Sequence, residues 1–303
     1  MTGKIDLIYI LSPSYSGSTL LTFLLGQHPA IATIGELKGT AMGDVQEYLC
    51  SCGARILECE FWVRVRCSAK EQGIELDLAH YDTHFGSDNT YFGRLANMSV
   101  RGKLLERIRS GLLQIVPGYT RYVDNLIDRN ASLMQIIMRE QNGKIFLDGS
   151  KDPRRLSHFL ESLEFNVKVI RLFRDGRGVS NSFAANERLT YGGGIETWIR
   201  ASDQIDRIFD NIPPENSIVV KYEDLCLGTK HVLLVLTEFI GIGEVPMKKE
   251  IPLKSSHING NKMRLAGTAD IKLNEKWREQ LTASDLDLFE RKAGQRNRTY
   301  GYA

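Results

Sequence analysis

The sequence predicts an α/β protein: a three-layer fold in which a parallel sheet of about five strands lies between helices on both faces. Apolar runs of strand length alternate with helical segments along most of the chain, as in doubly covered parallel sheets. The first run, residues 5–11, is apolar at nearly every position, which is typical of a strand buried on both faces. No internal repeat or low-complexity linker divides residues 1–303, so we expect a single domain.

The turn that leaves the first strand, residues 12–19, is rich in serine and contains Gly17. An apolar helix is expected at residues 20–25. Backbone N–H groups and the positive end of the helix dipole therefore meet at the turn, which favours bound phosphate or sulfate. Gly17 is followed by Ser18, not by the lysine of a Walker A loop, so a nucleoside triphosphatase is not expected. An ordinary connection with Ser16 or Ser18 as helix N-cap is the alternative.

The chain up to residue 141 is less regular. A brief strand is expected at residues 32–34, and helical spacing predicts helices at 104–115 and 122–139. Residues 50–116 mix glycine, histidine, asparagine and tyrosine with charged residues. We interpret residues 50–141 as an excursion from the sheet that covers a site.

Strands and helices then alternate regularly. Strands are expected at residues 144–148, 167–173 and 217–222, and the helices that follow them at 153–163, 178–189 and 229–240. In such sheets, ligands bind at the carboxyl ends of the strands. The predicted ends carry polar residues, namely Ser14–Thr19, Glu36, Ser150–Asp152, Arg174–Arg177 and Tyr222.

The composition is that of an ordered globular protein, with 42% hydrophobic and 25% charged residues. A net charge of +2 gives no reason to expect nucleic acid or an anionic membrane as partner. No apolar run is long enough to span a bilayer, and the N-terminal run is too short for a signal peptide. A cytoplasmic location is therefore expected.

Five cysteines, an odd number, fit a reducing compartment better than a disulfide framework. Cys50, Cys52, Cys59 and Cys67 lie close together in the sequence and offer four thiolates to a structural zinc ion. Their spacing matches no strong zinc pattern, and small buried cysteines are common. We therefore favour free thiols, and no metal site is expected.

A second anion site is predicted after the strand at residues 167–173. Arg174 leaves the strand, two glycines open the turn, and Ser180 and Ser182 enter the next helix. A guanidinium, helix N–H groups and a hydroxyl are then within reach of one phosphate. An Asp175/Arg177 pair capping the helix is the alternative. Two anion sites at strand ends of the same sheet favour a phosphate site over a helix cap.

The order and spacing of these motifs resemble those of bacterial sulfotransferases that use 3′-phosphoadenosine 5′-phosphosulfate (PAPS). Residues 16–20, Ser-Gly-Ser-Thr-Leu, are similar to the family's 5′-phosphosulfate loop, and residues 174–182 to its 3′-phosphate site. Residues 150–153, Ser-Lys-Asp-Pro, and 222–225, Tyr-Glu-Asp-Leu, resemble the protein-tyrosine sulfotransferase branch. The cysteine-rich stretch 50–62 recurs in bacterial members. The resemblance is weakest over residues 63–141.

This resemblance implies a P-loop-hydrolase-like sulfotransferase fold and an enzyme that moves a sulfuryl group from PAPS to a hydroxyl or amine. It assigns general-base catalysis to Glu36, stabilisation of charge to Lys151, and no metal. His257, residues 260–264 and Lys272 resemble the segment that closes over the nucleotide. The residues implied in binding PAPS are Tyr15, Ser16, Gly17, Ser18, Thr19, Arg174, Ser182, Tyr222, Arg264 and Lys272.

One departure from the family leaves alternatives open. Tyr15 stands where the family has lysine or arginine, so a cation is missing beside the leaving group. Lys272, Arg264 or Lys151 takes that role, or the protein is a non-catalytic PAPS sensor. A phosphotransferase on the same fold would need a loop lysine and a carboxylate for magnesium. His80 and His84 are rival bases, and the acceptor itself cannot be read from the sequence.

Overall fold

The computed structural model describes residues 3–39, 44–79, 81–86, 91–97, 111–113, 115–245, 251–252, 257–259, 262–265, 268–269 and 271–303. At residues 95–97, 251–252, 262, 264 and 268–269 the description is of the backbone alone. In these parts of the chain, no helix is both long enough and apolar enough to cross a membrane.

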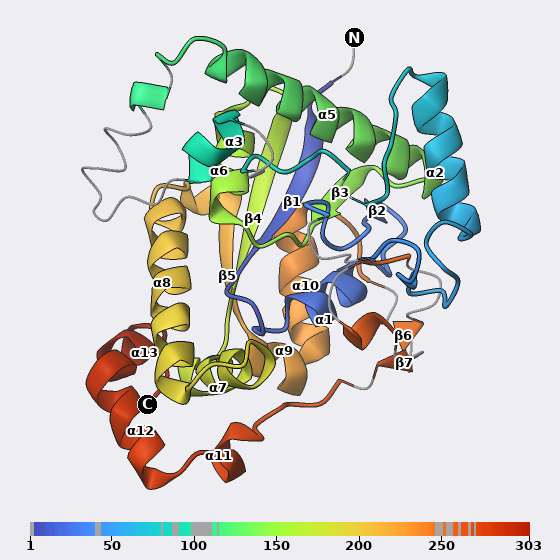
Figure 1. Ribbon diagram of the computed structural model, residues 1–303. Coiled ribbons are helices and arrows are strands. Elements are labelled where there is room, and N and C mark those ends of the chain that lie inside the picture. The colour runs from blue at the N-terminus through green and yellow to red at the C-terminus, as the bar shows by residue number, and fades with distance from the viewer. Residues whose placement is uncertain are drawn as a thin grey trace.

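A five-stranded parallel sheet forms the centre of the molecule, in the order β2-β3-β1-β4-β5 (Figure 1). The strands are β1 Ile5–Leu11, β2 Ile31–Ala32, β3 Ile145–Asp148, β4 Phe165–Phe173 and β5 Ser217–Lys221. Tyr9 in β1 pairs with Asp148 in β3 and with Val169 in β4, so β1 is the central strand. The prediction of a parallel sheet of about five strands is confirmed.

Side chains of β1 alternate between two hydrophobic cores. One core takes Ile5, Leu7, Tyr9 and Leu11, and the other takes Ile8 and Ile10. The first core is covered by α2 Glu60–Glu71, α5 Tyr119–Glu140 and α6 Pro153–Glu161 (Figure 1). The second is covered by α1 Ser18–Leu25, α9 Tyr222–Leu227 and α10 Thr229–Ile240. Burial on both faces explains why this strand is apolar nearly throughout.

A third apolar cluster lies beyond β4. It joins α7 Gly176–Asn186 and α8 Tyr191–Phe209 to the C-terminal elements α12 Ala283–Phe289 and η4 Glu290–Gly294. Trp198 and Phe289 pack with ring centroids 5.6 Å apart. The remaining C-terminal helices are α11 Trp277–Gln280 and α13 Gln295–Thr299. This cluster anchors the helix that follows Arg174.

Short elements complete the described chain. They are α3 Tyr91–Asn97, η1 Pro214–Asn216, η3 Lys262–Leu265, and an antiparallel pair, β6 Ile251–Pro252 with β7 Thr268–Ala269.

Several expected elements need correction. The brief strand predicted at residues 32–34 is at Ile31–Ala32, two residues long. Part of the segment expected to be irregular is helical, as α2 and α3. Helix α2 was not predicted because arginines, lysine and glutamates interrupt its apolar pattern. Its buried positions are Phe61, Trp62, Val65 and Ala69. The helix predicted at 104–115 lies mostly outside the described residues, although 111–113 are helical.

Candidate functional site

A cavity of about 1680 Å³ opens where the carboxyl ends of the strands meet. Single-ligand pockets usually measure about 300–1,000 Å³, so this cavity is larger than one small ligand needs. Two of the predicted site residues are not among those that line it. Ser16 is fully buried, and the side chain of Arg264 lies outside the described atoms. The predicted residues in its wall are Tyr15, Gly17, Ser18, Thr19, Glu36, Lys151, Arg174, Ser182, Tyr222 and Lys272.

The turn between β1 and α1 is held in an unusual backbone conformation. Tyr15 has φ +66° and Gly17 has φ +92°, both in the left-handed region. Gly17 is the N-cap of α1, with no side-chain cap, so neither Ser16 nor Ser18 is the N-cap. A Cβ at Gly17 would lie 2.4 Å from the ring of Tyr222, which leaves room only for glycine. Strained backbone of this kind gathers at ligand sites.

Two buried serine hydroxyls in this turn have no hydrogen-bond partner among the described residues. They are those of Ser12 and Ser16, which are 2% and 0% exposed. An unpaired buried hydroxyl destabilises the fold, and each such group in a native protein calls for an explanation. Ser12, which lines the cavity, and the N-terminus of α1 make the turn a candidate site for an acceptor-rich anion.

Tyr15 does not supply the positive charge that a lysine or arginine would bring at its position. Its hydroxyl donates to Glu187 Oε1 at 2.9 Å, and its ring meets that of Phe183 edge-on at 5.1 Å. Burial, and then the Glu187 carboxylate, raise the pKa of Tyr15 to about 12. The side chain therefore stays neutral at ordinary pH and is turned to α7.

Arg174 ties the end of β4 to two other segments. Its guanidinium donates to the carbonyls of Tyr15 and Asn274, both at 2.7 Å, and lies 4.8 Å from the centre of the Tyr222 ring. The hydroxyl of Ser182 donates to Gly178 O at 2.9 Å. Arg174 thus connects the β1 turn, the β5 end and the C-terminal segment at one wall of the cavity.

The C-terminal segment is fastened to the same wall through Tyr222. The hydroxyl of Tyr222 donates to Lys272 O at 3.3 Å and accepts from Asn274 N at 3.2 Å. Burial is the main reason that the pKa of Tyr222 is raised to about 12, so it remains a neutral donor. Lys272 is exposed and lines the cavity. These two hydrogen bonds join residues that are 50 and 52 positions apart in the sequence.

Glu36 and Lys151 form an ion pair inside the cavity, between Lys151 Nζ and Glu36 Oε1. Glu36 follows β2 and Lys151 follows β3, which are neighbouring strands. Lys151 has φ +65°, a conformation that is uncommon for a non-glycine residue. The structure therefore brings together the two residues predicted from separate motifs.

Lys38 was missed by the sequence reasoning. It lines the cavity and donates to Asp152 Oδ2 at 2.8 Å. Asp152 is also the N-cap of α6, accepting from Arg154 N and Arg155 N. No local motif marks Lys38, because its place beside Asp152 depends on the pairing of β2 with β3.

A buried ionic network supports the carboxyl end of β3. Arg155 Nε donates to Asp148 Oδ2 at 2.8 Å, and these side chains are 1% and 0% exposed. The same guanidinium donates to Thr83 O at 2.6 Å and to Asn130 Oδ1, and lies 4.7 Å from the Phe159 ring centre. The network joins β3 and α6 to two parts of the excursion, helix α5 and the segment that contains Thr83.

The histidine candidates differ in position. His80 lies outside the described residues. His84 lines the cavity, where its Nδ1 accepts from Gly86 N at 3.4 Å. His158, which was not considered from the sequence, also lines the cavity and stacks on Phe85 at 4.5 Å. Burial lowers the pKa of His158 to about 4, so this imidazole is neutral at pH 7.

One wall of the cavity comes from the excursion. Its apolar residues there are Phe85, Leu113, Tyr119, Val123 and Ile127, with Asp124 and Asp128 among them. His257, expected in the segment that closes over the nucleotide, is not among the residues that line the cavity. Its Nδ1 lies 3.3 Å from the Sγ of Cys59 instead. None of the five cysteines, all of which the structure describes, forms a disulfide.

The β1 turn with the N-terminus of α1 and Arg174 lie together at the carboxyl edge of a parallel α/β sheet, the edge at which such sheets bind their ligands. The model of the sulfotransferase family matches residues 7–245, which is more than half of the chain. The protein therefore belongs to the sulfotransferase family.

Among the solved structures to which this chain is similar in fold are two sulfotransferase domains. The sulfotransferase domain of the Synechococcus PCC 7002 olefin synthase is 19% identical, with a TM-score of 0.52 over 100% of this chain and 97% of that one. The sulfotransferase domain of the curacin biosynthetic pathway is 18% identical, with a TM-score of 0.51 over 96% and 98%. No curated protein sequence matches this chain.

Proposed function

We propose that this protein transfers a sulfuryl group from PAPS to a hydroxyl or amine of an acceptor. The observation that carries the proposal is the Glu36–Lys151 ion pair, which lies in the same cavity as Arg174 and the β1 turn. A carboxylate, a cation and two anion sites in one cavity are the groups that an in-line transfer between two oxygens needs.

The part of the cavity between the β1 turn and Arg174 offers backbone N–H groups and positive charge, both of which suit PAPS. Gly17, Ser18 and Thr19 at the N-terminus of α1 would hold the 5′-phosphosulfate with backbone N–H groups. Arg174 and Ser182 would bind the 3′-phosphate, and Tyr222 and Lys272 would close over the nucleotide. We also propose that the protein is related to the protein-tyrosine sulfotransferase branch, which residues 150–153 and 222–225 resemble.

In the reaction, the acceptor oxygen or nitrogen forms a bond to sulfur while the bond from sulfur to the bridging phosphate oxygen breaks. Glu36 takes the proton that the acceptor loses. Lys151 neutralises charge on the transferred group and on the bridging oxygen. Lys38, 2.8 Å from Asp152 and in the same cavity, is a further cation where Tyr15 brings none. The leaving product is 3′-phosphoadenosine 5′-phosphate (PAP).

The acceptor would bind against the wall made by the excursion. Phe85, Val123 and Ile127 offer apolar contact there, and Asp124 and Asp128 offer carboxylates. This pattern favours an acceptor with an apolar body and polar or cationic groups. Because His84 lies in the same wall, it is the alternative base to Glu36.

The test is transfer of labelled sulfate from PAPS to a mixture of hydroxyl and amine acceptors. Glu36→Gln keeps the shape of the side chain and removes the base, so kcat should fall by about 10²–10⁴-fold while PAP affinity stays nearly unchanged. Glu47→Gln, whose side chain is 73% exposed, is the matched control and should behave as wild type. If Glu36→Gln turns over normally and His84→Ala does not, the base is His84.

A non-catalytic PAPS sensor is the second candidate, because Tyr15 turns to Glu187 and brings no charge to the turn. A sensor would bind PAPS or PAP and leave PAPS intact with every acceptor. Calorimetric binding of PAP without release of sulfate to any acceptor would favour the sensor. Failure to bind PAP would contradict both candidates.

A further inference from the structure

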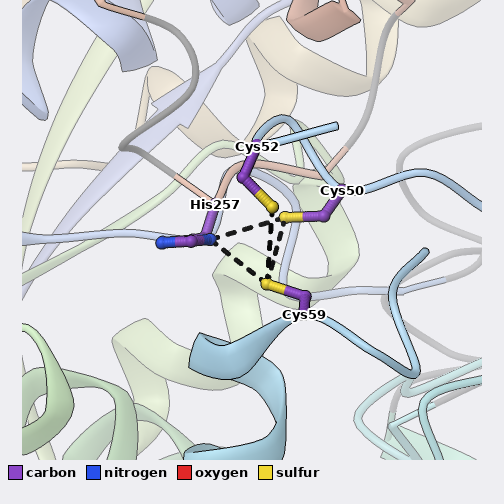
Figure 2. A group of neighbouring side chains, drawn as sticks. All are labelled: Cys50, Cys52, Cys59 and His257. Atoms are coloured by element: carbon purple, nitrogen blue, oxygen red, sulfur yellow. Dashed lines mark hydrogen bonds between the residues drawn. The ribbon is translucent and has the colours of Figure 1, made fainter. Parts of the chain in front are cut away.

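Four side chains from two distant parts of the sequence meet at one point outside the cavity. Cys50 and Cys52 lie in the loop before α2, Cys59 is the N-cap of α2, and His257 belongs to the C-terminal part of the chain (Figure 2). The three Sγ atoms and one imidazole nitrogen all lie within 4.8 Å of one another. Cys67, the fourth cysteine of the sequence cluster, is exposed and takes no part.

The spacing of these atoms fits a tetrahedral zinc site. With Zn–S bonds of about 2.3 Å and a Zn–N bond of about 2.0–2.1 Å, a tetrahedron has S···S edges of about 3.8 Å and S···N edges of about 3.5 Å. The S···S distances from Cys59 are 3.6 Å to Cys52 and 3.7 Å to Cys50. The distances from His257 Nδ1 are 3.3 Å to Cys59 and 3.6 Å to Cys50.

The surrounding structure holds the four groups in place. Gly53, with φ +92°, turns the loop after Cys52, and Gly53 N donates to Cys50 O at 2.9 Å. The Phe61 ring stacks on His257 with centroids 4.7 Å apart. His257 itself has φ +47°, an uncommon conformation for a non-glycine residue. Such strain persists where the neighbouring structure fixes the residue.

We propose that Cys50, Cys52, Cys59 and His257 bind a structural Zn²⁺ ion, as a closed site of three thiolates and one imidazole. Cys50 and Cys59 are buried, and all four ligands lie outside the residues that line the cavity, so no position is open to substrate. Each thiol gives up its proton to the solvent as zinc binds. The sequence-based preference for free thiols without metal is thereby replaced by this proposal.

The zinc ion would tie the C-terminal part of the chain to the sheet edge that carries Glu36. Next to His257, Ile258 N donates to Ser51 Oγ at 3.0 Å. The next residue, Asn259, donates through its backbone N to Ile34 O at 2.7 Å, two residues before Glu36. The site therefore positions residues 257–259 against the end of β2, and this inference does not depend on the sulfuryl-transfer proposal.

The experiment is metal analysis of the full chain, purified with a non-thiol reductant and without chelator. We expect about one zinc ion per chain in the wild type and in Cys67→Ser, the control that removes an exposed cysteine outside the site. Cys59→Ser and His257→Ala should hold at least about tenfold less zinc. His257→Cys, which restores a fourth ligand, should hold zinc again.

The wild-type protein alone provides a second measurement if the variants do not fold. Replacing zinc with Co²⁺ in the wild type should give a sulfur-to-cobalt charge-transfer band and the intense visible bands of tetrahedral cobalt. Substoichiometric zinc with all five thiols reactive in the native wild type would overturn the proposal. A Cys52–Cys59 or Cys50–Cys59 disulfide found by mass spectrometry under reducing purification would also overturn it.

Discussion

Replacing Arg155 by methionine tests the buried network that supports the Lys151 loop. The substitution keeps a side chain of similar length and removes the charge. It also removes the donors to Asp148 Oδ2 at 2.8 Å and to Thr83 O at 2.6 Å. Asp148, which is 0% exposed, then keeps hydrogen bonds from Ser150 but has lost its ion-pair partner.

The expected loss of stability is large because one member of a buried pair is left uncompensated. Removing one partner of a buried ion pair typically costs about 3–5 kcal/mol. For a chain of 303 residues, an unfolding entropy of about 2.1 cal/mol/K per residue converts this to a fall in Tm of about 5–8 °C. Arg278→Met removes an exposed pair with Glu275, in which the side chains are 58% and 40% exposed, and should lower Tm by less than about 2 °C.

Thermal unfolding followed by circular dichroism measures both variants, together with Asp148→Asn and the Arg155→Met/Asp148→Asn double variant. The double variant should be less destabilised than the sum of its single variants, because it leaves no buried charge unpaired. Additive losses, or a shift in Arg155→Met no larger than that of the Arg278 control, would refute the reasoning.

Three further predictions concern binding, metal and pH. Arg174→Ala should weaken PAP binding by about 1.5–3 kcal/mol in calorimetry; equal wild-type affinity for nucleotides with and without a 3′-phosphate would contradict this assignment. Turnover should need no added divalent ion; activity lost to brief chelation and restored by magnesium would instead favour the phosphotransferase. Burial lowers the pKa of His158 to about 4, so the unfolded chain binds a proton that the folded protein excludes between pH 6.5 and 4. Stability should therefore fall as pH drops through that window, by roughly 2 kcal/mol at pH 5. Urea unfolding of His158→Gln should show a flatter profile, and an unchanged profile would count against burial as the cause.

The sequence by itself determined the sheet. The strands β1, β3, β4 and β5 lie within about two residues of their predicted positions, because each contains a mainly apolar run of strand length. It also predicted that Glu36 and Lys151 would lie near each other, since the carboxyl ends of parallel strands meet at one edge. The ion pair between these two residues follows from that topology.

Only the tertiary structure decided which other side chains lie in the cavity and which side chains form the cysteine cluster. Lys38 and His158 left no recognised pattern, because their positions depend on packing between elements and not on local spacing. Helix α8 was missed although its buried residues follow helical spacing, at Ile195, Trp198, Ser202 and Ile205. Sequence proximity suggested Cys67 as the fourth group of the cysteine cluster, whereas the fold brings in His257, 198 residues after Cys59. Helix α2 begins at Glu60 and carries Cys67 away on its exposed face, while the contacts of Ile258 and Asn259 with the N-terminal part of the chain bring the histidine to the sulfurs.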